Sequence, residues 1–237
     1  MTRLLLKKLV QKRKSNGDLS RQLVTVLEPS GVGSEAYHTL RTKFLYALGE
    51  KPRKAVVITS SGPKEGKSIT CANLGAALAQ AGKNTLIIDC DLRMPTMDKI
   101  FKLSNSQGLV DILTNEADLP EVWQEPLPDL RVVTAGSLPP QPTALLDSNR
   151  FTELLDQVRQ TFDYVLVDTP PVEVVADAMI CAAQCDGVLL VLDQQETRKR
   201  AVLRSVRSLR AVDADILALV VNNVAPPRGG YSDKKQL

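Results

Sequence analysis

The sequence predicts an α/β fold in which one parallel β-sheet is covered by helices on both faces. Short runs rich in Val, Leu and Ile recur along the chain, and amphipathic stretches that could form helices separate them. Polar motifs follow several of these runs directly, at the strand ends where parallel sheets bind ligands. A chain of 237 residues, 43% of them hydrophobic, is long enough to bury one sizeable core.

The predicted elements alternate from residue 54 onwards. Buried strands are expected at residues 54–60, 84–90, 129–135, 163–169, 186–193 and 216–224. Helices are expected between them at residues 68–82, 108–115, 148–162 and 196–212. This alternation is typical of a parallel sheet that is buried on both faces. One more helix is expected ahead of the first strand, over residues 35–48, with Ser34 as its N-cap.

The chain is expected to divide into a basic arm and linker at 1–34, a domain at 35–224 and a flexible tail at 225–237. Residues 1–14 hold six Lys or Arg residues and no acidic residue, which leaves a net charge of −3 on the rest. That balance argues against a nucleic-acid-binding body. The arm also has an apolar side, so it could lie on an anionic membrane surface or be a solvated terminus, and both interpretations stay open.

The sequence shows no apolar run long enough to span a membrane and no signal-peptide pattern, so a cytoplasmic location is expected. The cysteines agree with that location because they lack metal-binding spacing and fall in apolar patterns typical of reduced core thiols. They are Cys71, Cys90, Cys181 and Cys185.

The first chemical motif is ITSSGPKEGKSIT, residues 58–70, between a predicted strand and a predicted helix. It ends in Gly66-Lys67-Ser68, the core of a phosphate-binding P-loop. In such a loop backbone N–H groups surround the phosphates, the lysine contacts their oxygens and the serine hydroxyl binds Mg²⁺. The usual pattern has Gly five places before Gly66, where this chain has Ser61. The residues expected to contact the nucleotide here are Ser61, Gly62, Pro63, Lys64, Glu65, Gly66, Lys67, Ser68 and Ile69.

The second motif is LIIDCDLR, residues 86–93, in which Asp89 and Asp91 end a buried strand. Alternate residues of a strand share one side, so both carboxylates point the same way. Two such carboxylates are costly unless a cation or a proton compensates them, and a metal-bound phosphate would do so.

The third motif is VLVDTPP, residues 165–171, in which an Asp follows strand residues and a Thr-Pro-Pro turn leads away. This is the form of a Walker B motif, with Asp168 holding Mg²⁺ directly or through water. Together with the first motif it predicts a P-loop NTPase fold that uses ATP and Mg²⁺.

The combination of LIIDCDLR with VLVDTPP resembles the bacterial tyrosine kinases, the P-loop autokinases of capsule and exopolysaccharide systems, in which the DxDxR element is called Walker A′. Segments 34–44, 136–148 and 174–192 are also similar to segments of that family. The resemblance extends over nearly the whole chain from about residue 30.

The resemblance implies a protein-tyrosine autokinase that regulates polysaccharide synthesis and export. Its catalytic residues would be Lys67, Asp89, Asp91 and Asp168. Ser68, Asp91 and Asp168 would hold the magnesium ion, and Asp89 would lie nearest the incoming tyrosine hydroxyl. Asn222 matches a position that contacts adenine in related folds, and Arg93 is expected to support the acidic pair.

The resemblance also implies partners. The tail of one subunit would enter the active site of a neighbour, with Tyr231 as the phosphoacceptor. Glu35, His38 and Arg41 would form an oligomer contact that can close a ring, although His38 stands where the family has an arginine. A transmembrane polysaccharide co-polymerase would act as activator at the inner face of the cell membrane, and a phosphotyrosine phosphatase would reverse the reaction.

Two alternatives remain open. A positioning ATPase of the partition and septum-site type shares the predicted fold, but its signature lysine lies five residues before the P-loop lysine, where this chain has Gly62. A nucleotide-binding regulatory subunit with little kinase activity is the other, because the tail holds one tyrosine where the family usually has several.

Overall fold

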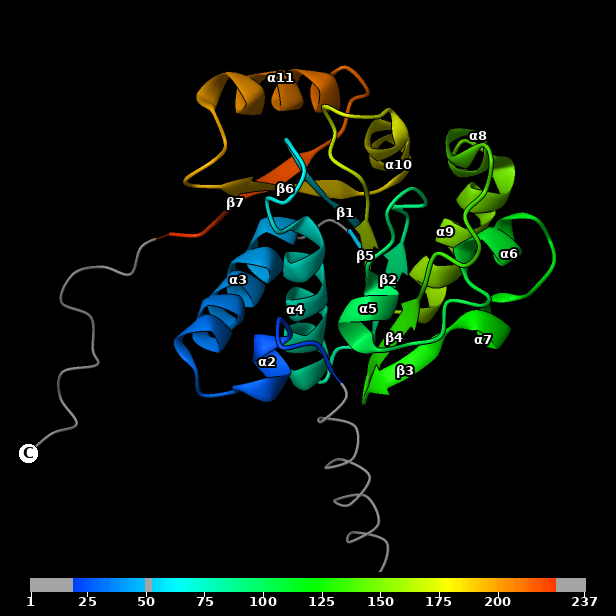
Figure 1. The fold of residues 1–237 in the computed structure, drawn as a ribbon, viewed down its shortest axis with the longest axis horizontal. Helices are drawn as coiled ribbons and strands as arrows, with labels where there is room; N and C mark the ends of the chain where they lie inside the picture. The colour runs from blue at the N-terminus through cyan, green and yellow to red at the C-terminus, as the bar shows by residue number, and fades with distance from the viewer. Residues whose placement is uncertain (1–18, 50–52, 225–237) are drawn as a thin grey trace, which may run out of the picture.

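A seven-stranded sheet runs through the part of the chain that the computed structural model describes, residues 19–49 and 53–224 (Figure 1). Its strand order is β3-β4-β2-β5-β1-β6-β7, and every neighbouring pair is parallel except β3 with β4. The predicted fold class is confirmed. The strands are β1 (Ala55–Ser60), β2 (Thr85–Asp89), β3 (Gln124–Leu127), β4 (Leu130–Val133), β5 (Tyr164–Asp168), β6 (Gly187–Asp193) and β7 (Ile216–Asn222).

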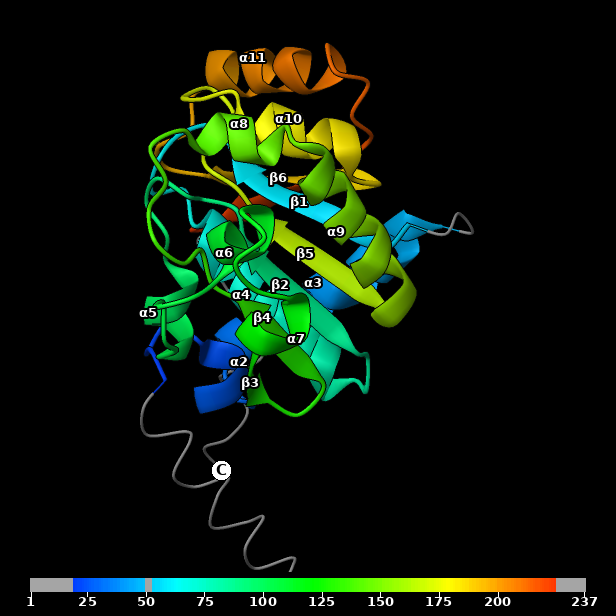
Figure 2. The same ribbon diagram turned by 90° about the vertical axis from the view of Figure 1, so that its right-hand side faces the viewer.

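Helices cover both faces of the sheet, as predicted (Figures 1 and 2). The helices α2 to α5 pack on one apolar core and α6 to α11 on another. Alternate residues of β1 divide between the two cores, because successive side chains of a strand point to opposite faces. The helices are α2 (Val24–Leu27), α3 (Val32–Leu48), α4 (Lys67–Gln80), α5 (Met97–Phe101), α6 (Leu109–Leu113), α7 (Leu119–Val122), α8 (Pro142–Leu146), α9 (Asn149–Thr161), α10 (Asp177–Gln184) and α11 (Lys199–Arg210).

The strand β3 was not predicted from the sequence. Its residues, Gln-Glu-Pro-Leu, carry a proline and little apolar character. It lies at the edge of the sheet, paired with β4 alone. A proline is tolerated there because an edge strand has backbone N–H groups that need no partner strand.

Residues 19–31 are packed into the fold, whereas the sequence predicted a linker up to residue 34. Leu23 is fully buried in the core beneath α4, together with Leu19 and Val26. Thr25 donates its backbone N–H and its hydroxyl to Asn73 Oδ1 of α4, at 3.1 and 3.0 Å. This segment is therefore part of the domain. Its helix α2 is too short to show the hydrophobic periodicity by which a helix is predicted from sequence.

The helix α3 begins at Val32, earlier than predicted, and its N-cap is Gly31. The prediction of Ser34 as N-cap is wrong. Ser34 is buried in the first turn, with its Oγ 3.3 Å from His38 Nε2 one turn later.

The strand order brings the three chemical motifs together at the carboxyl ends of the strands. β2, β5 and β1 are neighbours, and the loops after them carry the acidic pair, the Walker B segment and the P-loop. Asp89 is in register with Asp168, which is in register with Ile58. The topology thus places three parts of the chain at the carboxyl ends of adjacent strands, where such sheets bind ligands.

Replacing Leu23 by Ala should lower the free energy of unfolding by about 2–5 kcal/mol, because the change leaves a cavity in a packed core. Urea unfolding followed by circular dichroism measures this. The matched control is Val32→Ala, since Val32 is 83% exposed and should change stability by about 0.5 kcal/mol or less. Equal effects of the two changes would show that residues 19–31 are not part of the cooperative fold.

Candidate active site

The P-loop between β1 and α4 is shaped by two residues with positive φ. Lys64 has φ 65° and Gly66 has φ 90°. Left-handed residues of this kind are typical of loops whose backbone N–H groups form an anion-binding concavity. Glu65, between them, is buried and points its carboxylate back into the loop, where Oε2 accepts the N–H of Ser61 at 2.8 Å. Of the predicted nucleotide residues, 61–66 therefore form one continuous loop, and 67–69 belong to the first turn of α4.

Residues far away in the sequence hold this loop in place. Thr197, just before α11, donates its hydroxyl to Glu65 Oε1 at 2.6 Å. Ser205 of α11 donates to Ser61 Oγ at 2.9 Å. Neither Thr197 nor Ser205 was predicted, because each acts through a tertiary contact that carries no local sequence pattern.

Asn222 lies against the P-loop at the end of β7. Its side-chain N–H donates to the carbonyl of Glu65 at 2.9 Å and to Thr70 Oγ1 at 3.2 Å. A Cβ atom added to Gly66 would collide with this amide. The contact with adenine predicted for Asn222 stays a prediction, while in this structure the side chain holds the loop that surrounds the phosphates.

Lys67, Ser68, Asp91 and Asp168 form a buried polar cluster at the floor of the P-loop. Lys67 Nζ lies 2.9 Å from Asp91 Oδ2 and 3.6 Å from Asp168 Oδ2. It also donates to Ser68 Oγ at 2.9 Å, and Ser68 in turn donates to Asp168 Oδ2 at 2.6 Å. Four residues that the sequence assigned to phosphate and magnesium binding are thus in direct contact.

The charges of the cluster shift one another. Burial alone would lower the pKa of Lys67, but the carboxylates of Asp168 and Asp91 raise it well above its ordinary value. Burial raises the pKa of Asp168 to about 6, and the nearby Lys67 and Ser68 only partly oppose this. The lysine therefore remains charged, while Asp168 gives up its proton less readily than a solvated aspartate.

Asp89 is fully buried beside Asp168 and is bonded to the loop that follows β2. Its Oδ2 accepts the N–H groups of Thr96 and Met97, both at 3.0 Å, and its Oδ1 accepts the N–H of Asp91 at 3.1 Å. Burial and the charge of Asp168 raise the pKa of Asp89 to about 7, although the N–H groups of Met97 and Thr96 oppose the rise. Asp89 thus fixes the position of Asp91 and can exchange a proton near neutral pH.

Arg93, which was predicted to support the acidic pair, makes its side-chain hydrogen bonds elsewhere, although the charge of Asp91 adds to the hydrogen bond with Asp177 in raising its pKa. Its Nε donates to Asp177 Oδ2 at 2.8 Å, and its Nη2 donates to Thr143 Oγ1 at 3.0 Å. Asp177 begins α10 and is fully buried, so this charged contact ties the Walker A′ loop to α8 and α10. Asp177 falls in the segment 174–192 that resembles the family, but no sequence pattern predicts its contact with Arg93, which lies 84 positions away.

The cluster fits a magnesium ion. Asp168 Oδ1 is buried and has no hydrogen-bond partner among the described residues. Mg²⁺ prefers oxygen ligands and is usually held by one or two carboxylates together with phosphate oxygens and water. Asp168, Asp91 and the hydroxyl of Ser68 would supply the protein oxygens of such a site.

The other predicted residues lie elsewhere. Glu35 is exposed on α3, whereas Arg41 donates to the carbonyl of Ala77 in α4 at 3.1 Å, and His38 is half-buried. Their role in an oligomer stays a prediction. Tyr231 and the basic arm at 1–14 lie outside the described residues.

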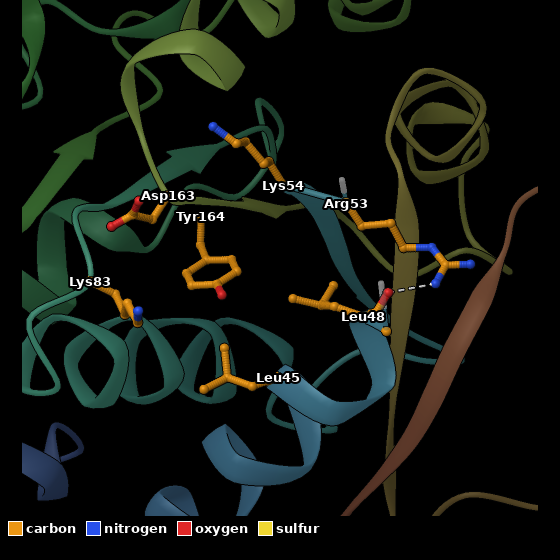
Figure 3. A pocket seen from close by; sticks show the side chains of 8 residues that line it. Leu45, Leu48, Arg53, Lys54, Lys83, Asp163 and Tyr164 are labelled. Carbon is orange, nitrogen blue, oxygen red and sulfur yellow. Dashed lines mark hydrogen bonds between the residues drawn. The ribbon is translucent and has the colours of Figure 1, made fainter. Parts of the chain in front are cut away.

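A cavity of about 280 Å³ lies at the amino-terminal ends of the strands, on the side of the sheet opposite to the P-loop (Figure 3). The ring of Tyr164 points into it beside Leu45, and Lys54 lines one side. Lys54 Nζ already donates to two backbone carbonyls, at 2.7 and 3.2 Å. None of the lining residues belongs to the P-loop, so the cavity is separate from it. The ammonium group of Lys54 is already hydrogen-bonded within the fold.

Comparison with known proteins agrees with this geometry. Residues 54–215 match the family model described as an AAA domain. The chain is 37% identical over 212 residues to the tyrosine-protein kinase YwqD of Bacillus subtilis, covering 89% of this chain and 90% of YwqD. It is 35% identical over 201 residues to the tyrosine-protein kinase CpsD of Streptococcus agalactiae, covering 84% of this chain and 86% of CpsD. The chain belongs to the bacterial tyrosine kinase family.

Solved structures support the same assignment. The kinase domain of the Escherichia coli tyrosine kinase ETK has a TM-score of 0.81 and 30% identity, over 86% of this chain and 82% of that one. The chimerical protein CapA2B2 has a TM-score of 0.83 and 33% identity, over 87% of this chain and 92% of that one. The cell division ATPase MinD of Pyrococcus furiosus, at 22% identity and a TM-score of 0.62, shares the fold.

No helix in residues 19–49 and 53–224 of this kinase is long and apolar enough to cross a membrane.

Replacing Gly66 by Ala should abolish nucleotide binding, because the added Cβ would collide with Asn222 and force the P-loop to move. Titration with a fluorescent ATP analogue measures the loss. The matched control is Gly82→Ala, because Gly82 also has a positive φ, 72°, but has no atom within 4 Å of the added Cβ. It should cost about 1 kcal/mol of stability and leave the affinity unchanged. Loss of binding in both variants would contradict the role of Asn222.

The effect of Asp168→Asn on stability should depend on pH. The pKa of the Asp168 carboxyl group is near 4 in the unfolded chain and about 6 in the folded one. Ionisation therefore begins to destabilise the folded state as the pH rises above 4, and the destabilisation is complete above pH 6. Asn removes this penalty, so the variant should gain about 2 kcal/mol relative to the wild type between pH 4 and pH 7. Urea unfolding of the nucleotide-free proteins across this range measures the difference, and a constant difference would contradict the account.

Proposed function

We propose that this kinase transfers the γ-phosphoryl group of Mg-ATP to Tyr231 of a second copy of the chain. The observation that carries the proposal is the direct contact of Lys67 with Asp91 and Asp168 on the floor of the P-loop. The contact of the P-loop lysine with Asp91, in addition to the Walker B residue Asp168, distinguishes this site from one that uses a single Walker B carboxylate. The similarity to the tyrosine-protein kinases YwqD and CpsD supports the same reaction.

Nucleotide binding would reorganise the cluster. Lys67 now pairs with carboxylates, and an ATP phosphate would compete for the same ammonium group. The magnesium ion, held by Ser68, Asp91 and Asp168, would supply positive charge that neutralises the phosphate oxygens during transfer. Helix α4 begins at Lys67, so its first backbone N–H groups and its dipole would add to the binding of phosphate.

Asp89 is the proposed proton acceptor for the tyrosine hydroxyl. Its pKa of about 7 suits a base that works near neutral pH. Its Oδ1 accepts one N–H group, that of Asp91, and a carboxylate oxygen has room for a second hydrogen bond. Because Asp89 is fully buried, the acceptor tyrosine would have to displace part of the loop around Asp91 to reach it.

The proposal extends to the cellular setting. We infer that the chain acts in capsule or exopolysaccharide synthesis, at the inner face of the cell membrane, with a transmembrane co-polymerase as activator and a phosphatase as antagonist. Its similarity to the chimerical protein CapA2B2, whose name joins two parts, supports a domain that works with a second polypeptide segment. A ring through Glu35, His38 and Arg41 of α3 is the proposed assembly.

A mixing experiment tests transfer between copies. Lys67→Ala should reduce phosphorylation about 100-fold or more, because it removes the phosphate-binding charge. Tyr231→Phe should remove the acceptor. Mixing the two variants with Mg-ATP should restore phosphate on Tyr231 of the Lys67→Ala chain, as measured by intact-mass spectrometry.

The control is Lys83→Ala, which removes a lysine at the opposite edge of the sheet and should leave the reaction unchanged. Phosphate on the Tyr231→Phe chain alone would mean that another residue is the acceptor. The absence of phosphate in the mixture, with an active wild type, would rule out transfer between copies.

A further inference from the structure

We propose that the outer face of α11 is a docking surface for an anionic lipid membrane. This outer face consists of Lys199, Arg200, Leu203, Arg207 and Arg210, all of which are exposed. The inference assigns a part of the folded domain to the peripheral membrane location proposed above. It does not depend on phosphoryl transfer, so a membrane-binding experiment tests it separately.

The periodicity of α11 places cations on one side and apolar residues on the other. Ser205 and Leu209 are buried against the body of the domain. The residues of the outer face recur at spacings of three, four and seven, which place them together on the opposite side. Both views show α11 as the outermost layer above the sheet, with no other labelled element on its far side (Figures 1 and 2).

The charge of this helix is largely uncompensated. Residues 198–210 hold six Lys or Arg residues and no acidic residue. Among the described residues, the one ion pair of α11 joins Arg204 to Glu173 at 2.7 Å. Glu196 before the helix and Asp213 after it are the nearest acidic residues in sequence, and they lie beyond its two ends. The outer face therefore presents four cations that form no ion pair within the described chain.

The shape of the outer face fits a membrane better than a peptide. The face is the convex side of a helix about 18 Å long. None of its residues lines the cavity beside Tyr164 or a second cavity beside Met179. An acidic peptide would need a groove to hold it, whereas a planar anionic surface needs only a row of cations. Leu203, 48% exposed in the middle of the row, can enter the headgroup region as interfacial helices do.

Docking through α11 would orient the active site. Ser205, on the inner side of α11, is bonded to Ser61 of the P-loop, and Thr197 at the start of the helix is bonded to Glu65. The helix is thus attached directly to the nucleotide site. A membrane bound to its outer face would hold the P-loop at a fixed distance and angle from the lipid surface.

Vesicle sedimentation of the full chain tests the proposal. The probe is a set of phosphatidylcholine vesicles with and without phosphatidylserine. We expect binding to the phosphatidylserine vesicles alone, with an affinity that falls as the salt concentration rises. A variant with Lys199, Arg200, Arg207 and Arg210 all changed to Gln should bind at least about tenfold more weakly, because each cation near an anionic surface contributes to binding.

Two further variants keep the test decisive. Changing Arg200, Arg207 and Arg210 to Lys retains the charge and should retain binding, whereas a site that recognises carboxylates or phosphates through bidentate guanidinium contacts would lose it. Changing Arg3, Lys7, Lys8 and Lys12 of the basic arm to Gln removes the same number of cations elsewhere and should weaken binding less than the change in α11.

The proposal is overturned if the wild type does not bind phosphatidylserine vesicles, or if the Gln variant of α11 binds them as the wild type does. It is also overturned if the Lys variant loses binding as fully as the Gln variant, because that result would show a site that binds phosphate or carboxylate groups through guanidinium contacts and not through a row of charges. An unchanged affinity of the Gln variant for a fluorescent ATP analogue confirms that its fold is intact.

Discussion

The buried contact of Lys67 with Asp91 and Asp168 is the interaction on which the rest of the structure depends. Placing carboxylates at the ends of adjacent buried strands is unfavourable, as the raised pKa values of Asp89 and Asp168 show. The lysine compensates part of this charge, and a magnesium ion would compensate more. The uncompensated negative charge of this site would therefore favour the binding of a magnesium ion.

Much of the fold follows from the sequence because strand and helix periods are local. The apolar runs that form β1, β2, β5 and β6 are unmistakable, since each is buried on both faces. The predicted linker before α3 fails for the opposite reason. Leu23 and its neighbours are buried against α4, which lies tens of residues away in the sequence. No local sequence pattern predicts such a contact.

The same division applies to the site. Lys67, Ser68, Asp89, Asp91 and Asp168 carry motif spacing, and the structure brings them together. Asp177, Thr197 and Ser205 act through single long-range contacts with Arg93, Glu65 and Ser61. Sequence motifs identify the groups that are proposed to bind the nucleotide, whereas the residues that position those groups are found only in the folded structure.

These positioning contacts link the nucleotide site to the molecular surface. The P-loop is bonded to α11 and to β7, and the Walker A′ loop is bonded to α8 and α10. A partner or a membrane that moves one of these outer elements would therefore act on the loops that hold the phosphates. Such coupling would allow a bound partner or membrane to change the activity of the enzyme.

The most direct test of the account is the site and stoichiometry of phosphorylation in the wild type and in Asp168→Asn, both incubated with Mg-ATP. Intact-mass spectrometry followed by peptide mapping gives both quantities. We expect one phosphate per chain, located on Tyr231, in the wild type and none in the variant. Phosphate on Tyr231 of the variant at the wild-type level would show that the buried cluster does not carry the reaction.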